Sequence, residues 1–163
     1  IDEYLAFARG VGTENATYED LARHLQSAAA DATRLGLVVH QAPADAASDA
    51  PLLLKMRPQA LQRVFANILQ NALIYARTAL NPVPHVWITI NRHADHVAIL
   101  FDDNGPGIPA ERYEDVFRPF VRLEESRNSE TGGIGLGLAI ARDIIHSHGG
   151  DITLGVSPHK GLR

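Results

Sequence analysis

One stretch of the chain, Leu61 to Tyr75, repeats apolar and polar positions with the period of an α-helix. At roughly 100° per residue, its apolar side chains form a single stripe made of Leu61, Val64, Phe65, Ile68, Leu69, Ala72 and Leu73. Such a stripe is typical of a helix that packs on a core. Pro58 stands just upstream, where the first turn of a helix needs no N–H donor. The pattern therefore predicts a central helix around which the fold is organised.

Polar side chains follow one edge of this stripe. Asn67, Asn71 and Tyr75 are spaced i, i+4 and i+8, so they share one face of the predicted helix. An amide beside an apolar face costs free energy unless it is hydrogen-bonded. Either a polar partner meets this row, or the asparagines are solvated or cap another segment. The helix alone leaves both interpretations open.

Further elements are predicted from apolar spacing and from turn residues. Helices are expected at Tyr18 to Arg34, closed by Gly36, at Leu136 to His146 and, as a short segment, at Glu111 to Phe117. Strands are expected at Leu37 to His40, Pro51 to Met56, Val86 to Ile90, His96 to Phe101 and Asp151 to Val156. Polar loops are expected at Ala42 to Asp49 and Val121 to Gly133.

The third and fourth of these strands are separated by a short turn and form a predicted antiparallel hairpin. Elsewhere strands and helices alternate only in part. We therefore predict an α+β fold, a two-layer α/β sandwich whose mixed sheet is covered on one face by about three helices.

Composition narrows the functional classes. The chain has 163 residues, 45% of them hydrophobic, which is enough for one core and one domain. A formal charge of -4 and an isoelectric point near 6.0 argue against nucleic acid or an anionic membrane as partner, because both need a basic face. The absence of cysteine excludes disulfides and thiolate chemistry. No apolar run approaches the roughly 20 residues of a membrane span.

A glycine-rich segment precedes the last predicted helix and reads Gly132-Gly133-Ile134-Gly135-Leu136-Gly137-Leu138. Glycines let backbone N–H groups approach an anion, and a helix N-terminus adds a partial positive charge, so a phosphate would fit. The segment lacks the Gly-Lys-Ser/Thr of a P-loop, and Ile140 stands where the dinucleotide fingerprint needs Gly or Ala. A tight turn with close helix packing is the other interpretation.

A second segment, Asp103-Asn104-Gly105-Pro106-Gly107-Ile108, directly follows a predicted strand. A carboxylate held against an apolar floor can accept a hydrogen bond from an exocyclic amine, and adenine offers one. A β-turn with aspartate at its first position explains the same residues without a ligand.

Taken in order, these motifs resemble the conserved boxes of sensor histidine kinases. Asn67-x3-Asn71-Ala72 is similar to the N box, Asp103-x-Gly105-x-Gly107 to the first glycine box, and Phe117-x-Pro119-Phe120 to the F box. Gly133-x-Gly135-x-Gly137-Leu138 is similar to the second glycine box. The resemblance covers about Pro58 to Val156, and it implies the Bergerat-type ATP-binding fold shared with gyrase, heat-shock chaperone and mismatch-repair ATPases.

The resemblance implies a site for ATP and Mg²⁺. Asn71 would bind the magnesium through its side-chain oxygen, and Asn67 would contact a phosphate or the metal's shell. Tyr75 would stack on adenine and Asp103 would bind its amino group. The complete nucleotide site implied by the resemblance is Asn67, Asn71, Tyr75, Asp103, Gly105, Gly107, Ile108, Arg118, Arg122, Gly133, Gly135, Leu136, Gly137 and Leu138. Val121 to Gly132 would form a lid over the nucleotide.

Residue 67 separates two kinds of chemistry within the resembled superfamily. Its hydrolytic members carry a glutamate one turn before the metal-binding asparagine, and this glutamate activates water. An amide cannot take a proton at neutral pH. Asn67 therefore predicts that the γ-phosphoryl of ATP passes to a group supplied from outside. In the resembled family this acceptor is a histidine on a dimeric helical hairpin, and the phosphoryl then passes to a response regulator.

The acceptor histidine is not expected within this chain, because none of its histidines is followed by Glu or Asp and then Pro in the acceptor pattern. Residues 1–10 are interpreted as the end of a preceding dimerisation helix or linker, and residues 11–163 as the catalytic domain with its final strand missing. The fragment is expected to be a monomer that does not phosphorylate itself. The full-length protein is expected to be a homodimer, anchored in the inner membrane with this domain in the cytoplasm.

Three other interpretations remain open. The chain could be a self-sufficient ATPase of the same superfamily, although that would require Glu at position 67. It could also be a non-catalytic nucleotide-binding or docking module. Zinc binding through His93 with His96, or His146 with His148, is disfavoured because no third ligand clusters with either pair. Ile74 departs from the family, whose members often carry a basic residue there.

Overall fold

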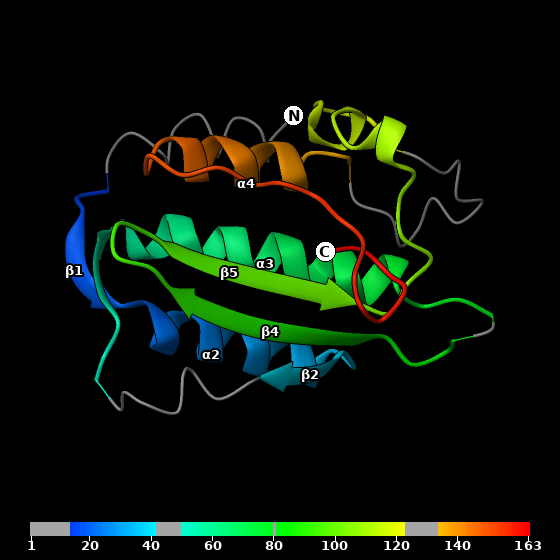
Figure 1. Ribbon diagram of the computed structural model, residues 1–163, viewed down its shortest axis with the longest axis horizontal. Helices are drawn as coiled ribbons and strands as arrows, with labels where there is room; N and C mark the ends of the chain where they lie inside the picture. Colours follow the sequence, from blue (N-terminus) through cyan, green and yellow to red (C-terminus); the bar gives the residue numbers. More distant parts are fainter. Residues whose placement is uncertain (1–13, 42–49, 80, 123–133) are drawn as a thin grey trace.

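The computed structural model describes residues 14–41, 50–79, 81–122 and 134–163. Figure 1 shows the arrangement of its elements along the chain. These elements are β1 (Thr17–Asp20), α2 (Leu21–Arg34), β2 (Val38–Gln41), β3 (Leu53–Met56), α3 (Pro58–Tyr75), β4 (His85–Arg92), β5 (Val97–Asp103), the 3-10 turns η1 (Ala110–Arg112) and η2 (Asp115–Phe117), and α4 (Gly137–His146).

The strands form two small sheets. In the larger sheet the order is β2-β4-β5, with β2 parallel to β4 and β4 antiparallel to β5. The smaller sheet pairs β1 with β3 in antiparallel register. The predicted hairpin and the predicted mixed sheet are therefore both confirmed.

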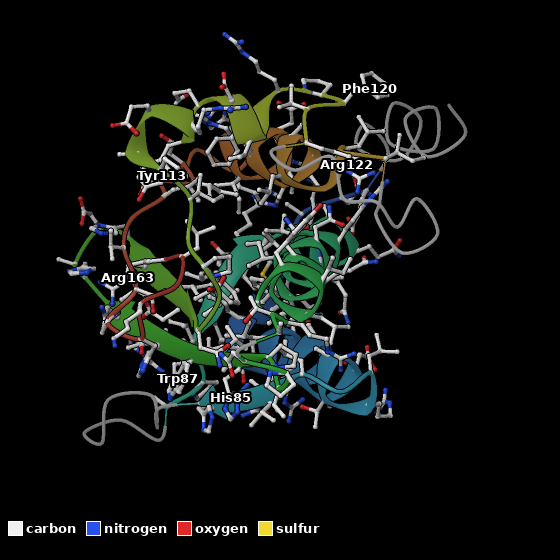
Figure 2. All side chains as sticks on the ribbon, turned by 90° about the vertical axis from the view of Figure 1, so that its right-hand side faces the viewer. His85, Trp87, Tyr113, Phe120, Arg122 and Arg163 are labelled. Atoms are coloured by element: carbon white, nitrogen blue, oxygen red, sulfur yellow. The ribbon has the colours of Figure 1, made fainter. Side chains whose placement is uncertain are left out.

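The core lies between the larger sheet and the helices. Figure 2 shows β4 and β5 on one side of the molecule, with α2 and α3 packed on the other. Phe65 and Leu69 of α3 are 2% and 1% exposed, and Val86 and Ile88 of β4 meet them from the sheet. The helix α3 packs on α2 at one flank and on α4 at the other. This is the predicted two-layer sandwich with helices on one face of the sheet.

The helix α2 begins later than predicted. Residues from Tyr18 onward were expected to be helical, but Thr17–Asp20 form β1, in which Tyr18 pairs with Lys55. Asp20 then caps the helix, because its Oδ1 accepts hydrogen bonds from the N–H groups of Ala22 and Leu52, both at 3.2 Å. Pairing with a strand distant in sequence overrides the helical spacing of these residues.

The end of α2 is closed by Gly36, as predicted. Gly36 adopts φ +102°, which only glycine tolerates well. Its N–H donates to the carbonyl of Thr33 at 3.0 Å, and the N–H of Leu37 donates to that of Ala32 at 3.1 Å. These two bonds form a Schellman motif and direct the chain into β2.

Two other predicted elements differ from the structure. The short helix expected at Glu111 to Phe117 is replaced by η1 and η2, two separate 3-10 turns. The strand expected at Asp151 to Val156 is not formed; within it only Val156 makes a β-bridge, to Leu162.

The predicted helix tail at residues 1–10, the predicted loop at 42–49 and residues 123–132 of the predicted lid lie outside the described residues. Within the described ranges, no helix has the length and apolar character needed to cross a bilayer.

We expect Gly36→Ala to lower the free energy of unfolding by about 1 kcal/mol, the cost of a left-handed backbone for a residue with a Cβ. An added Cβ would meet nothing within 4 Å, so the cost would come from the backbone alone. Gly155→Ala is the matched control, because that Cβ would also lie in open space but at an ordinary φ. Urea unfolding of both variants measures the difference, and equal stabilities would contradict the prediction.

Candidate functional site

The predicted site residues come from elements that meet at one end of the molecule. The carboxyl ends of α3 and β5 and the amino end of α4 all point to the right-hand side of Figure 1. Because side chains at these ends belong to segments far apart in sequence, only the fold can bring them together.

The first contact joins the predicted N box to the second glycine segment. The side-chain amide of Asn67 in α3 donates to the carbonyl of Gly137 at 3.0 Å. An added Cβ on Gly137 would lie 3.6 Å from the amide carbon of Asn67, so the two residues are in van der Waals contact. Gly137 is the first residue of α4, and among the described residues no side chain caps this helix start. Its first N–H groups therefore remain suited to bind an anion.

Asn71 lies one helical turn beyond Asn67 on the same edge of α3. Its side chain is half-buried, and it makes no hydrogen bond within the described part of the chain. An amide oxygen with no internal partner fits the predicted role as a ligand of Mg²⁺, which prefers oxygen donors. Tyr75 ends the same edge and is 43% exposed, so its ring remains accessible to a base.

The second contact joins the first glycine segment to the end of α3. A Cβ added to Gly105 would lie 2.8 Å from the Cα of Ala76 and 3.2 Å from the carbonyl oxygen of Tyr75. No side chain fits between these backbones, so glycine is required at position 105. Gly107 adopts φ +71°, a left-handed backbone conformation that favours glycine at this position. The half-buried Ile108 follows directly.

Asp103 ends β5 beside this contact. Its Oδ1 accepts the N–H of Gly105 and the N–H of Leu162, both at 2.9 Å. Burial raises the pKa of the Asp103 carboxyl, as does the neighbouring Asp102, while the two N–H bonds act in the opposite direction. Within the described residues no donor reaches Oδ2. One carboxylate oxygen is thus held by two backbone donors, while the other accepts no hydrogen bond from the described residues.

The third contact joins the predicted F box to the second glycine segment. The N–H of Phe120 donates to the carbonyl of Gly135 at 2.9 Å, and both residues have positive φ, 66° and 80°. A Cβ on Gly135 would lie 3.0 Å from the carbonyl oxygen of Val121. Close backbone approach therefore explains the glycine at position 135.

The two candidate lid arginines differ in their surroundings. Arg118 is exposed and lies 3.4 Å from Asp115, so it forms a surface ion pair. Arg122 is half-buried, and Figure 2 shows it closer to the helices than Phe120, which lies at the outer edge of the molecule. Of the two arginines, Arg122 is therefore the better placed to face a bound ligand.

The remaining predicted residues divide by burial. Leu136 is buried and Leu138 half-buried, so both pack around the start of α4. Gly133 lies outside the described residues. The hollow found between α2 and β2 is lined by Gln26, Ala29, Ala30, Thr33, Val39 and Gln41, and it contains none of the predicted site residues.

Sequence reasoning missed the part of the site contributed by Gly161 to Arg163. An added Cβ on Gly161 would collide with the Asp103 carboxylate and backbone, and Leu162 hydrogen-bonds to the same aspartate. The sequence did contain a signal for these contacts, namely two adjacent aspartates at the end of a strand. Consecutive strand residues point to opposite faces of a sheet, so only one of Asp102 and Asp103 can face the helices. The other aspartate needed a partner on the open face of the sheet.

The histidines of the two pairs weighed as zinc ligands contact other groups of the protein. Within the described residues no three potential ligands are close enough to hold a metal ion. His146 lies 2.8 Å from Asp151. His148 accepts the N–H of Arg57 at 3.1 Å and so joins the end of α4 to the start of α3. The ring of His93 stacks on that of His96.

Comparison with known proteins shows the family of the chain. Residues 56–163 match the family model described as histidine kinase-, DNA gyrase B-, and HSP90-like ATPase. The chain is 38% identical over 141 residues to the sensor histidine kinase CpxA of Escherichia coli K12, covering 85% of the chain and 28% of CpxA. It is 45% identical over 95 residues to the sensor protein VanS of Enterococcus faecium, covering 58% of the chain and 23% of VanS. The chain thus spans about a quarter of these relatives.

Solved structures share the fold. The ATP-binding domain of PrrB from Mycobacterium tuberculosis superposes with a TM-score of 0.67 at 25% identity, covering 91% of this chain and 93% of that one. The mycobacterial sensor histidine kinase MprB gives a TM-score of 0.70 at 23% identity over 86% of both chains. At this identity the second likeness concerns the fold alone.

We expect Asp103→Asn to alter stability in a pH-dependent way. Because burial raises the pKa of the Asp103 carboxyl above 3.8, the folded state binds this proton more tightly than the unfolded state. Protonation of Asp103 therefore adds to the free energy of unfolding of the wild type at low pH. This added stability is lost as the pH rises through the raised pKa. Asparagine keeps the Oδ1 acceptor without a charge to desolvate. The stability of the variant relative to wild type should therefore improve as pH rises.

Urea unfolding at several pH values from about 4 to 7 measures this trend. Asp95→Asn is a control of opposite sign. The hydrogen bond from His96 lowers the pKa of the Asp95 carboxyl, so that variant should lose stability relative to wild type as pH rises. A pH-independent difference at Asp103 would contradict the prediction.

Proposed function

Because this chain belongs to the family of histidine kinase-, DNA gyrase B- and HSP90-like ATPases, we propose that it is the catalytic, ATP-binding domain of a sensor histidine kinase. Its substrate would be ATP with Mg²⁺. Its reaction would be transfer of the γ-phosphoryl group to a histidine on a separate domain.

One observation carries the proposal. Both glycine segments contact α3, one through the bond from Asn67 to Gly137 and the other through the packing of Gly105 on the backbone of Tyr75 and Ala76 at the end of the helix. The edge between these contacts holds Asn71 and ends at Tyr75. A nucleotide lying along this edge would place its base at Asp103 and its phosphates at the start of α4.

Each end of the proposed site suits one end of ATP. The free oxygen of Asp103 would accept the exocyclic amine of adenine, and Tyr75 would stack on the ring. The N–H groups at the start of α4, with the glycine segment from Gly133 to Gly137, would hold the phosphates. Asn71 would hold the Mg²⁺, which would neutralise and orient the phosphates. Arg122, and with it Arg118, would add positive charge from the lid.

The identity of residue 67 favours transfer over hydrolysis. The Asn67 side chain donates a hydrogen bond to a backbone carbonyl, which a glutamate carboxylate at that position could not do. The chain thus has an amide where a self-sufficient ATPase of this family needs a base. The acceptor of the phosphoryl group would come from outside the domain.

The relatives point to the partners of such a domain. The sensor proteins CpxA and VanS extend well beyond the matched region, because the chain covers 28% and 23% of their lengths. We propose that the full protein also carries a histidine-bearing dimerisation domain preceding this one, which would include residues 1–10. The full protein would act as a homodimer and pass its phosphoryl group to the receiver domain of a response regulator. It would be anchored in the membrane, with this domain in the cytoplasm.

Calorimetry with a non-hydrolysable ATP analogue and Mg²⁺ tests the site. Asn71→Ala and Asp103→Ala should each weaken binding about tenfold or more, the equivalent of one lost hydrogen bond to a charged partner. Asn91→Ala and Asp95→Ala, on β4 and in the β4–β5 turn, are matched controls that should bind like wild type. Undiminished binding by both site variants would refute the assignment.

Phosphoryl transfer tests the reaction. With ATP labelled on the γ-phosphate, the chain alone should acquire no label, because it lacks the acceptor. Addition of the histidine-bearing helical domain of the full-length protein should give label on that domain. Steady release of free phosphate by the chain alone would instead support the self-sufficient ATPase. Binding without transfer to any added domain would support a non-catalytic module.

A further inference from the structure

An ion pair between a buried aspartate and an exposed arginine lies directly beside the proposed adenine site. Asp102 in β5 is 4% exposed, and its two carboxylate oxygens accept Nε and Nη2 of Arg163 at 2.8 and 2.9 Å. This is the parallel two-bond geometry that arginine forms with carboxylates and lysine cannot reproduce. Figure 2 shows Arg163 beside the strands, well away from Phe120 and Arg122.

The residue before Arg163 binds the neighbouring aspartate. Leu162 exchanges two hydrogen bonds with Asp103, since its N–H reaches Oδ1 and its carbonyl accepts the Asp103 N–H, both at 2.9 Å. Gly161 packs so closely on Asp103 that a Cβ there would collide with the carboxylate and the backbone. Residues 161–163 therefore hold two consecutive aspartates, whose side chains lie on opposite faces of the sheet.

The segment that makes these contacts is itself braced. Arg163 and Gly155 exchange backbone hydrogen bonds of 2.8 and 2.9 Å, and the N–H of Ser157 donates to the carbonyl of Gly161 at 3.0 Å. The ring of His159 stacks on that of Trp87 in β4 with centroids 3.5 Å apart. Residues 155–163 therefore form a tight hairpin fastened to β4 by stacking and to β5 by the ion pair.

The two bonds to Oδ1 set the orientation of the Asp103 carboxylate. One comes from Gly105 within the same loop, and the other comes from Leu162 in the hairpin. If the hairpin were released, Oδ1 would lose one of its two donors and the carboxylate could rotate. A hydrogen bond to a base depends on that orientation, because its strength falls steeply as the angle departs from linear.

We propose that Arg163 is a positioning residue for base recognition. By fixing the hairpin to Asp102, it holds the Leu162 N–H against Oδ1 of Asp103 and so presents the other carboxylate oxygen to the exocyclic amine of adenine. This inference rests on the proposed function, because it assigns Asp103 the reading of that amine. Arg163 itself touches no nucleotide in this arrangement.

Base discrimination separates this role from a general effect on stability. Hypoxanthine has a carbonyl where adenine has the amine, so IDP cannot make the bond that Asp103 accepts. Calorimetry gives the dissociation constants of ADP and IDP with Mg²⁺ for each protein. We expect wild type to bind ADP more tightly than IDP. Arg163→Gln should reduce the ratio of the IDP dissociation constant to the ADP dissociation constant about tenfold, toward the value for Asp103→Ala. Binding of IDP should change little.

Further variants sharpen the test. Arg163→Lys keeps the charge without the two parallel bonds and should give an intermediate ratio. Arg23→Gln, which changes an exposed arginine on α2, is the matched control and should keep the wild-type ratio. If Arg163→Gln does not fold, because it leaves the Asp102 charge buried without its partner, Asp102→Asn removes that charge and should reduce the ratio similarly.

Each outcome bears on a different claim. Equal loss of ADP and IDP binding, or an unchanged ratio in folded Arg163→Gln and Asp102→Asn, would overturn the positioning role. If wild type bound neither nucleotide, the proposed function itself would fail. If wild type discriminated and Asp103→Ala did not, while the Arg163 variants behaved like wild type, only this inference would be lost.

Discussion

Burial of the apolar stripe of α3 is the constraint on which the rest of the structure depends. Phe65 and Leu69 are almost completely buried between the sheet and the flanking helices, so the helix cannot rotate about its axis without exposing them. That fixed rotation sets the direction of the polar edge that carries Asn67 and Asn71. The Asn67 amide, which would otherwise be costly beside an apolar face, thereby meets the carbonyl of Gly137 at the start of α4.

Glycines allow the surrounding segments to approach this edge closely. Gly105 lies against the backbone at the end of α3, and Gly135 against the backbone of Val121, in both cases with no room for a Cβ to fit comfortably. Within the described residues no side chain caps the helix start at Gly137, which suits its first N–H groups to the proposed binding of an anion. Close backbone packing and an unsatisfied helix terminus together make a surface suited to phosphates and a base. The glycines and the uncapped helix start, which leave few side-chain contacts here, would serve the proposed binding of ATP.

The two carboxylates at the end of β5 lie in different surroundings, because consecutive strand residues point to opposite faces of the sheet. Asp102 and Asp103 are adjacent in sequence, yet one carboxylate pairs with Arg163 on the open face and the other is partly buried beside the helices. Burial raises the pKa of Asp103, while the hairpin that binds both residues supplies one of its hydrogen bonds. The adenine end of the proposed site would therefore depend on both faces of the sheet, because the hairpin that binds Asp102 on one face also donates to Asp103 on the other.

Local patterns in the sequence determined the central helix, the β4–β5 hairpin and the glycine turn at Gly36, because period, turn residues and backbone freedom act over a few neighbouring positions. They also predicted which residues could bind a nucleotide, since amide, carboxylate and glycine chemistry belongs to the residue itself. The start of α2 at Leu21 and the hairpin of residues 155–163 were decided by tertiary structure. Pairing of Tyr18 with Lys55 and of Arg163 with Asp102 joins residues far apart in the chain, and no local periodicity records such contacts.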